Sequence, residues 1–213
     1  MTTIKLTTLN PDYRKRLAHQ IDSIVDLSIR AWVEAVLARA PQTFWTAPAS
    51  ATGRYHPICA RGRGGLLVHT RRVCWIASRF TAAKIGAGAS PQESLRNADA
   101  LTAACILHDT MKPFDYEDHA GLAAELASRM WTCMVNAGKV DLAAGDAVGA
   151  AIVAIMRHMG PWSHPRCLAP IDEYGTIDLL CYQSDYLASR PDLGTPVDGD
   201  PAARAVRKTK WRR

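Results

Sequence analysis

Apolar residues recur at intervals of three or four along most of this chain, which is the spacing of one face of an α-helix. The pattern predicts helices over residues 11–39, 66–86, 90–108, 119–135, 141–159 and 176–189. Proline or glycine follows several of the predicted helix ends, as expected of residues that stop a helix. The sequence contains no alternating apolar and polar run that would predict a strand ladder. The pattern therefore predicts an all-α fold, a single-domain helical bundle.

Two segments lack this periodicity. Residues 41–65 are rich in Pro, Gly, Ala, Thr and Arg, which predicts a long loop, and long loops are more often functional than idle. The chain beyond Pro191 is rich in Pro, Gly and Asp and then becomes basic. We therefore expect an N-terminal helix and loop at 1–54 packed on a core at 55–190, followed by a basic, loosely ordered tail at 191–213.

Composition sets the class of protein. The 213 residues are 48% hydrophobic and 22% charged, as in a globular domain. No apolar run approaches the roughly 18 residues that cross a bilayer, and the first residues lack the apolar core of a signal peptide. We expect a cytoplasmic protein with no membrane partner. Six cysteines are scattered singly, which indicates reduced thiols rather than a disulfide framework; they are Cys59, Cys74, Cys105, Cys133, Cys167 and Cys181.

The formal net charge is +6, and the excess is uneven. One basic group lies in the last ten residues, and a second surrounds the glycines that precede His69. The second group comprises Arg54, Arg61, Arg63, Arg71 and Arg72. Such charge favours polyanionic partners, phosphates included, without identifying one. The alternative interpretation of the terminal group is a solvated tail with no partner.

The stretch from Leu101 to Pro113 carries the strongest chemical signal. Its apolar positions recur at helical spacing and place His108 on the buried face, while Asp109 follows directly and Pro113 stops the helix. An unpaired buried charge costs several kcal/mol, so both side chains need a partner. A divalent cation is one partner that a neutral imidazole and a carboxylate can both bind.

Two further predicted helices place a metal-binding side chain on an apolar face, namely His69 and Asp185. A single buried histidine is more often a hydrogen-bonded core residue than a metal ligand. The coincidence of His69, the adjacent pair and Asp185 is harder to explain by packing. A carboxylate between Cys181 and Ala188 in particular needs compensation.

The order His69, His108-Asp109 and Asp185 on successive helices resembles the HD-domain metal-dependent phosphohydrolase superfamily. The stretch Gly-Gly-Leu-Leu-Val-His69-Thr-Arg-Arg-Val is similar to the first motif of that superfamily, and the resemblance covers residues 55–190. The resemblance implies a helical bundle of the HD-domain type, in which these four side chains bind a first metal ion.

In two-metal members of the superfamily, histidines between the His-Asp pair and the last Asp bind a second cation, and the Asp of the pair bridges both. The resemblance therefore implies second-site roles for His119, His158 and His164, although His164 could equally be an exposed loop residue. His56 lies outside the pattern and is expected to line the substrate cleft. The cofactors implied are one or two divalent ions from the set Mn, Fe, Ni, Co, Zn and Mg.

Lys112 completes a His-Asp-x-x-Lys motif that resembles the phosphodiesterase and nuclease branches, in which the lysine faces substrate phosphate. The triphosphohydrolase branch usually has histidine there, although Pro113-Phe114 and His119-Ala-Gly121 are similar to that branch. Thr110-Met111 replaces the usual Ile-Gly, a departure that affects local packing. Arg71 and Arg72 are expected to neutralise charge on the phosphoryl oxygens, together with Lys112.

These features predict a hydrolase that cleaves phosphoesters of nucleotides or nucleic acid through a metal-activated water, with Asp109 and Lys112 as its catalytic residues. A deoxynucleoside triphosphate triphosphohydrolase or nucleotidase is one alternative. A non-catalytic nucleic-acid-binding or regulatory scaffold is another. Trp45, Tyr55 and Trp162 lie in loops near candidate ligands and could stack on a base, with core packing as the competing interpretation of each.

Overall fold

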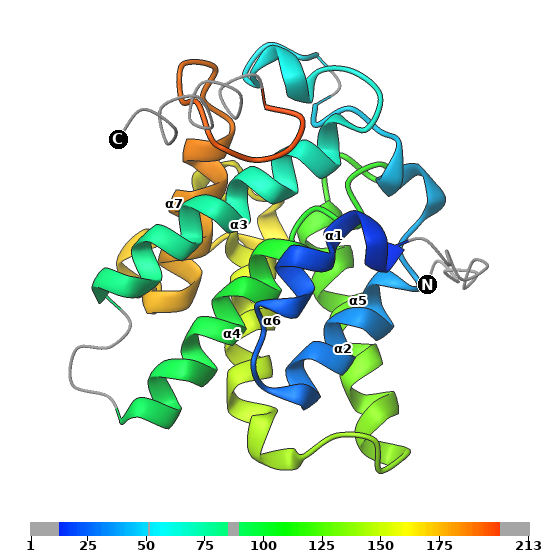
Figure 1. The fold of residues 1–213 in the computed structure, drawn as a ribbon, viewed down its shortest axis with the longest axis vertical. Coiled ribbons are helices and arrows are strands. Elements are labelled where there is room, and N and C mark those ends of the chain that lie inside the picture. The colour runs from blue at the N-terminus through cyan, green and yellow to red at the C-terminus, as the bar shows by residue number, and fades with distance from the viewer. Residues whose placement is uncertain (1–12, 51, 85–89, 201–213) are drawn as a thin grey trace, which may run out of the picture.

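The computed structural model describes residues 13–50, 52–84 and 90–200. Within these ranges the fold is all-α without strands, which confirms the predicted all-α single domain (Figure 1). The helices are α1 (Tyr13–Asp22), α2 (Leu27–Leu37), α3 (Gly65–Lys84), α4 (Pro91–Leu107), α5 (His119–Asn136), α6 (Gly145–Arg157) and α7 (Thr176–Ala188). Short 3-10 turns lie in the connections between them.

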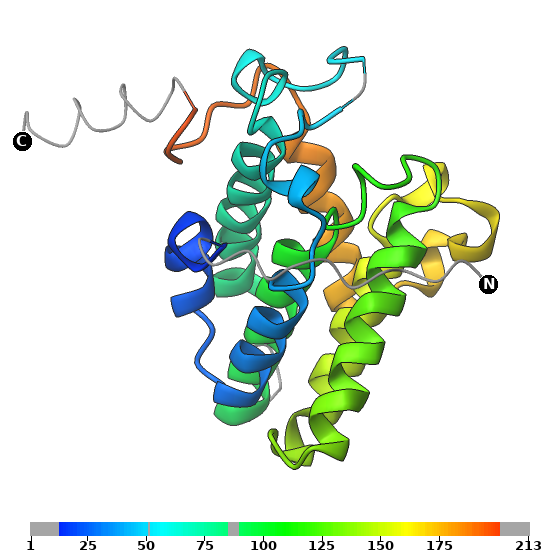
Figure 2. The same cartoon turned by 90° about the vertical axis from the view of Figure 1, so that its right-hand side faces the viewer.

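Helix α4 is the central element of the bundle. It packs against α2, α3, α6 and α7, while α5 packs against α2 and α6. Its buried face includes the small side chains of Ala100, Ala103 and Ala104, which allow neighbouring helices to approach closely. Figure 2 shows α5 and α6 together on one side of the bundle and α3 on the other. The C-terminal end of α4 is therefore enclosed by helices from several parts of the chain.

The prediction of one continuous helix over 11–39 is wrong, because the chain breaks between α1 and α2. Asp26 caps α2, its side chain accepting hydrogen bonds from the backbone N–H groups two and three residues on. Asp99 of α4 accepts the backbone N–H groups of Val25 (3.0 Å) and Asp26 (2.7 Å). These two carboxylates satisfy the amides that the break exposes, so the break is stabilised although the apolar pattern runs through it.

The expectation of a loosely ordered tail from residue 191 is also wrong for its first part. Residues 191–200 return to α3, where the fully buried guanidinium of Arg72 holds them. Arg72 donates hydrogen bonds to the carbonyl oxygens of Ala188 and Leu193 and forms an ion pair with Asp200. The basic residues predicted for the end of the tail lie at 204–213, outside the described residues.

The six cysteines are all free thiols, which confirms the interpretation that they form no disulfide framework. Ser90 caps α4, since its side chain accepts a hydrogen bond from the backbone N–H of Glu93. Among the described helices, none combines the length and apolar character needed to cross a membrane.

The segment between α6 and α7 begins with a glycine that packs against α7. Gly160 has a φ of +56°, a backbone conformation that side chains disfavour, and a Cβ placed there would lie 2.5 Å from the Tyr182 ring. This contact holds the start of the segment between α6 and α7 against α7.

Gly160→Ala is expected to lower the free energy of unfolding by at least about 1–2 kcal/mol from the left-handed conformation alone. Urea denaturation would measure the change. Gly149→Ala is the matched control, because Gly149 is exposed in α6 and a Cβ there meets no atom within 4 Å. This control should raise the free energy of unfolding by about 0.5–1 kcal/mol. Equal stability of Gly160→Ala and the wild type would contradict the prediction.

Candidate metal centre

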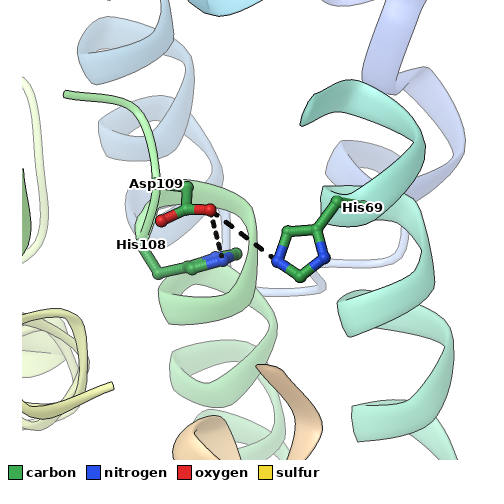
Figure 3. Close-up of side chains that lie close together, drawn as sticks. All are labelled: His69, His108 and Asp109. Atoms are coloured by element: carbon green, nitrogen blue, oxygen red, sulfur yellow. Dashed lines mark ion pairs between the residues drawn. The ribbon is translucent and has the colours of Figure 1, made fainter. Parts of the chain in front are cut away.

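His108 and Asp109 lie at the enclosed C-terminal end of α4. His108 is the C-cap of the helix, and both side chains are fully buried. Figure 3 shows His69, which projects from α3, pointing toward the same place. A helix end thus carries an imidazole and a carboxylate into the protein interior, where a third side chain meets them.

The structure brings together six of the predicted metal ligands from five helices. They are His69 (α3), His108 and Asp109 (end of α4), His119 (first residue of α5), His158 (C-cap of α6) and Asp185 (α7). Their nitrogen and oxygen atoms fall into overlapping groups, each with ligand atoms within 4.8 Å of one another. This cluster is the candidate metal centre.

The two carboxylate oxygens of Asp109 face different pairs of histidines. Its Oδ2 lies 3.7 Å from His69 Nε2 and 3.4 Å from His108 Nε2. Its Oδ1 lies 3.1 Å from His119 Nε2 and 3.5 Å from His158 Nε2. A carboxylate placed in this way can serve two cations at once, one through each oxygen.

Asp185 adds a second carboxylate to one side of the cluster. Its Oδ1 lies 2.8 Å from His69 Nε2 and 3.7 Å from His108 Nε2. The group of His69, His108 and the two aspartates is therefore richer in negative charge than the group formed by Asp109, His119 and His158.

Backbone carbonyls set the orientation of three imidazoles. The Nδ1 atoms of His108, His119 and His158 lie 2.9, 3.1 and 2.7 Å from the carbonyl oxygen of the residue three positions earlier. A carbonyl oxygen only accepts, so Nδ1 carries the hydrogen, and Nε2 of a neutral ring presents its lone pair to the cluster. His119 Nε2 and His158 Nε2 are 3.3 Å apart, a separation at which two lone pairs repel.

Several buried polar atoms of the cluster have no hydrogen-bond partner, including His108 Nε2 and Asp109 Oδ1. Buried polar atoms without a partner are costly and therefore uncommon. A divalent cation accepts electron pairs from imidazole nitrogen and carboxylate oxygen alike, so it would satisfy these atoms and the facing lone pairs together. The residues present fit a metal ion on this ground.

The electrostatic environment of the cluster also favours a bound cation. Burial raises the pKa of Asp109, but Lys112 and His108 outweigh burial and hold that pKa well below its usual range. Burial lowers the pKa of His108, yet the carboxylates of Asp109 and Asp185 raise it to about 9. Two carboxylates thus concentrate negative potential at the point that the Nε2 atoms face.

Lys112 lies at the edge of the cluster. Its Nζ donates a hydrogen bond of 2.8 Å to Asp109 Oδ2. The side chains of Lys112 and Asp185 remain 12% and 15% exposed, whereas those of the four histidines and Asp109 are at most 1% exposed. The cluster therefore meets solvent on the side where Lys112 and Asp185 lie.

His56 is buried and packs beside the cluster. Its ring centroid is 4.9 Å from that of His69. Both ring nitrogens are buried without a hydrogen-bond partner, and burial, reinforced by His69 and Lys112, lowers its pKa to about 3. His56 is therefore a neutral imidazole that can accept or donate one hydrogen bond beside His69.

Three predicted site residues lie elsewhere, and their roles are corrected. Arg72 faces the residues 191–200 described above and is not available to a substrate. Arg71 donates hydrogen bonds to the carbonyl oxygens of Arg16 (2.6 Å) and Asp198 (3.4 Å), in a groove of about 710 Å³ between α1 and α3. His164 is half-buried with its Nδ1 3.7 Å from Asp118, and it belongs to none of the metal-binding groups among the described residues.

The three aromatic residues considered as base-stacking candidates differ in burial. Trp45 is buried and packs edge-on against Phe44, with ring centroids 4.9 Å apart, so the packing interpretation is correct for this residue. Tyr55 and Trp162 are exposed. The sequence interpretation missed the carbonyl groups that orient the histidines, although a histidine at a helix end is a recognisable signal for such a bond.

The fold and the cluster define an all-α protein with buried His/Asp groups that can hold a metal ion. No protein-family model, curated protein or solved structure matches this chain.

Proposed function

We propose that this protein is a metal-dependent phosphohydrolase of the HD-domain type, which hydrolyses phosphoester bonds of nucleotides or nucleic acid. The observation that carries the proposal is the position of Asp109, with one carboxylate oxygen toward His69 and His108 and the other toward His119 and His158. Two ligand groups that share a carboxylate suit the cleavage of a phosphoester, in which charge develops on both the attacking and the leaving oxygen.

Each side chain has a definite role in this proposal. His69, His108, Asp109 and Asp185 would hold one ion, and Asp109, His119 and His158 a second. Divalent cations bound there would lower the pKa of a water molecule and polarise a phosphoryl oxygen. Lys112 is cationic, because the carboxylates of Asp109 and Asp185 outweigh burial and raise its pKa. On the open side of the cluster, its Nζ would pair with a phosphoryl oxygen and stabilise the negative charge that builds there.

Metal analysis and hydrolysis assays test this proposal directly. The purified protein should contain bound metal and hydrolyse bis(p-nitrophenyl) phosphate or p-nitrophenyl phosphate in the presence of manganese, magnesium, nickel or cobalt. A chelator should abolish hydrolysis, and added metal should restore it. Lys112→Met should keep the metal content and lose about 100-fold or more in kcat. Bound metal with salt-dependent oligonucleotide binding but no hydrolysis would contradict the proposal and favour a non-catalytic scaffold.

A further inference from the structure

Aromatic side chains gather on the surface formed by α7 and the segment that precedes it. The rings of Trp162 and Tyr186 are nearly parallel, with an interplanar angle of 7° and centroids 6.0 Å apart. Tyr182 lies beside both, 6.5 Å from the Trp162 ring and 6.3 Å from the Tyr186 ring. The guanidinium of Arg190 lies over the Tyr186 ring at 4.3 Å, a cation–π contact. We call these four residues the aromatic platform.

Packing of the protein on itself does not account for the platform. Trp162 remains 62% exposed and Tyr186 40% exposed, although both contact neighbouring rings. Large aromatic side chains usually bury most of their surface, and an exposed aromatic cluster commonly marks a binding surface. Part of the Trp162 ring therefore remains open to a flat ligand.

The platform adjoins the open side of the metal centre. Tyr186 follows Asp185 directly in α7. Tyr182 lies three residues before Asp185 on the same helix, a spacing at which side chains are neighbours on the helix surface. Asp185 is in turn one of the two cluster side chains that reach solvent. A ligand lying on the rings would thus extend toward the side from which the centre is accessible.

The inner part of the platform is held in place before any ligand arrives. The backbone of Gly160 packs against the Tyr182 ring, and the Tyr174 ring meets Tyr182 edge-on with centroids 6.4 Å apart. Tyr174 in turn donates a hydrogen bond of 3.0 Å to the carbonyl oxygen of Arg157. A preformed surface loses little conformational entropy on binding, which favours affinity.

We propose that the aromatic platform binds unpaired bases of a single-stranded nucleic acid whose backbone reaches the metal centre. This inference rests on the proposed function and narrows its substrate class to a single-stranded polynucleotide rather than a free nucleotide. Every base has a flat face that stacks on an aromatic ring, and those faces are accessible only where the strand is unpaired. Arg190 would add a positive charge beside the stacked base.

Oligonucleotide binding tests the inference. Fluorescence anisotropy would measure the affinity of the purified protein for a labelled single-stranded oligonucleotide with phosphorothioate linkages, which prevent turnover. Stacking contributes about 1–3 kcal/mol per base, so Trp162→Ala should weaken binding about 5- to 150-fold. Trp162→Phe, which keeps an aromatic face, should retain most of the affinity. An unlabelled duplex should compete poorly.

Two matched controls locate the binding surface. Leu168→Ala removes an exposed apolar side chain from the same segment and should leave the affinity unchanged. Arg79→Ala removes a cation from the groove between α1 and α3 and should also have little effect. Unchanged affinity of Trp162→Ala, a loss confined to Arg79→Ala, or equal competition by duplex would each overturn the inference.

Failure of this inference is distinguishable from failure of the proposed function, because bis(p-nitrophenyl) phosphate carries no base. If the protein hydrolyses that compound in a metal-dependent way and Trp162→Ala binds the oligonucleotide normally, the proposed enzymatic function stands and the proposed role of the aromatic platform is refuted. If Trp162→Ala weakens oligonucleotide binding but the wild-type protein hydrolyses neither bis(p-nitrophenyl) phosphate nor p-nitrophenyl phosphate, the role of the aromatic platform stands and the proposed enzymatic function is refuted.

Discussion

Asp109→Ala is expected to release metal from both halves of the cluster and to abolish phosphoester hydrolysis. Asp109 offers one oxygen to each pair of histidines, so its removal would take a ligand from each of the two proposed ion sites. Metal analysis should show metal per chain falling to near zero. Hydrolysis should fall by more than the roughly 10- to 100-fold seen when only a supporting partner of a ligand is lost.

The fold should survive this substitution. The helices are held by an apolar core that surrounds α4, and alanine is tolerated at a helix end. Far-ultraviolet circular dichroism should therefore show nearly unchanged helicity. Glu117→Ala is the control, because it removes an exposed carboxylate from the neighbouring loop and should leave metal content and rate unaffected. Wild-type activity of Asp109→Ala would refute the assignment of the centre.

Arg72→Ala is expected to produce a large loss of stability outside the centre. The buried guanidinium donates to the carbonyl oxygens of Ala188 and Leu193, which would lose this donor, and its ion pair with Asp200 would be lost as well. Breaking a buried ion pair by removing one partner costs about 3–5 kcal/mol. In a chain of this size that cost corresponds to a fall in Tm of roughly 10 °C.

Thermal unfolding of Arg72→Ala and of its neighbour Arg71→Ala would check this expectation. Arg71 makes two hydrogen bonds to backbone carbonyl oxygens and is only partly buried, so its removal should cost about 1 kcal/mol. Similar values of Tm for the two variants would show that the buried network around Arg72 contributes little.

The side chains of the candidate metal centre could be predicted from the sequence because their positions follow helical periodicity. His69, His108 and Asp185 each occupy an apolar stripe, and a polar side chain on such a stripe needs a partner in the interior. The same reasoning applies to His158, whose helical face is apolar. The predicted and observed positions agree for the side chains whose direction is set by the helix that carries them.

Helical periodicity alone would have predicted that Arg72 is buried, but its charge led to the expectation of an exposed side chain. Position 72 lies three residues after His69 and four before Ile76, and so shares their buried face. The guanidinium of Arg72 was expected to face solvent or a substrate phosphate, whereas residues 191–200 provide its hydrogen-bond acceptors. Those acceptors are more than a hundred residues distant in the sequence, and no local pattern predicts them.

The break between α1 and α2 and the position of His164 have the same kind of cause. The break depends on Asp99, which lies in another helix and accepts the exposed amides. His164 lies in a segment of short turns, and Arg166 of that segment pairs with Asp118 and Glu125. Tertiary contacts decide both features, so the residue types alone were insufficient.

The bonds from Nδ1 to backbone carbonyl oxygens restrict which side chains could replace His108, His119 or His158. A carboxylate has no hydrogen to offer the carbonyl oxygen and would repel it, whereas an imidazole donates at one edge and presents a lone pair at the other. The backbone carbonyl oxygens therefore favour imidazole over carboxylate at all three positions. Imidazole nitrogen suits ions such as zinc, iron or nickel better than calcium, so these backbone bonds would favour such elements at the proposed metal centre.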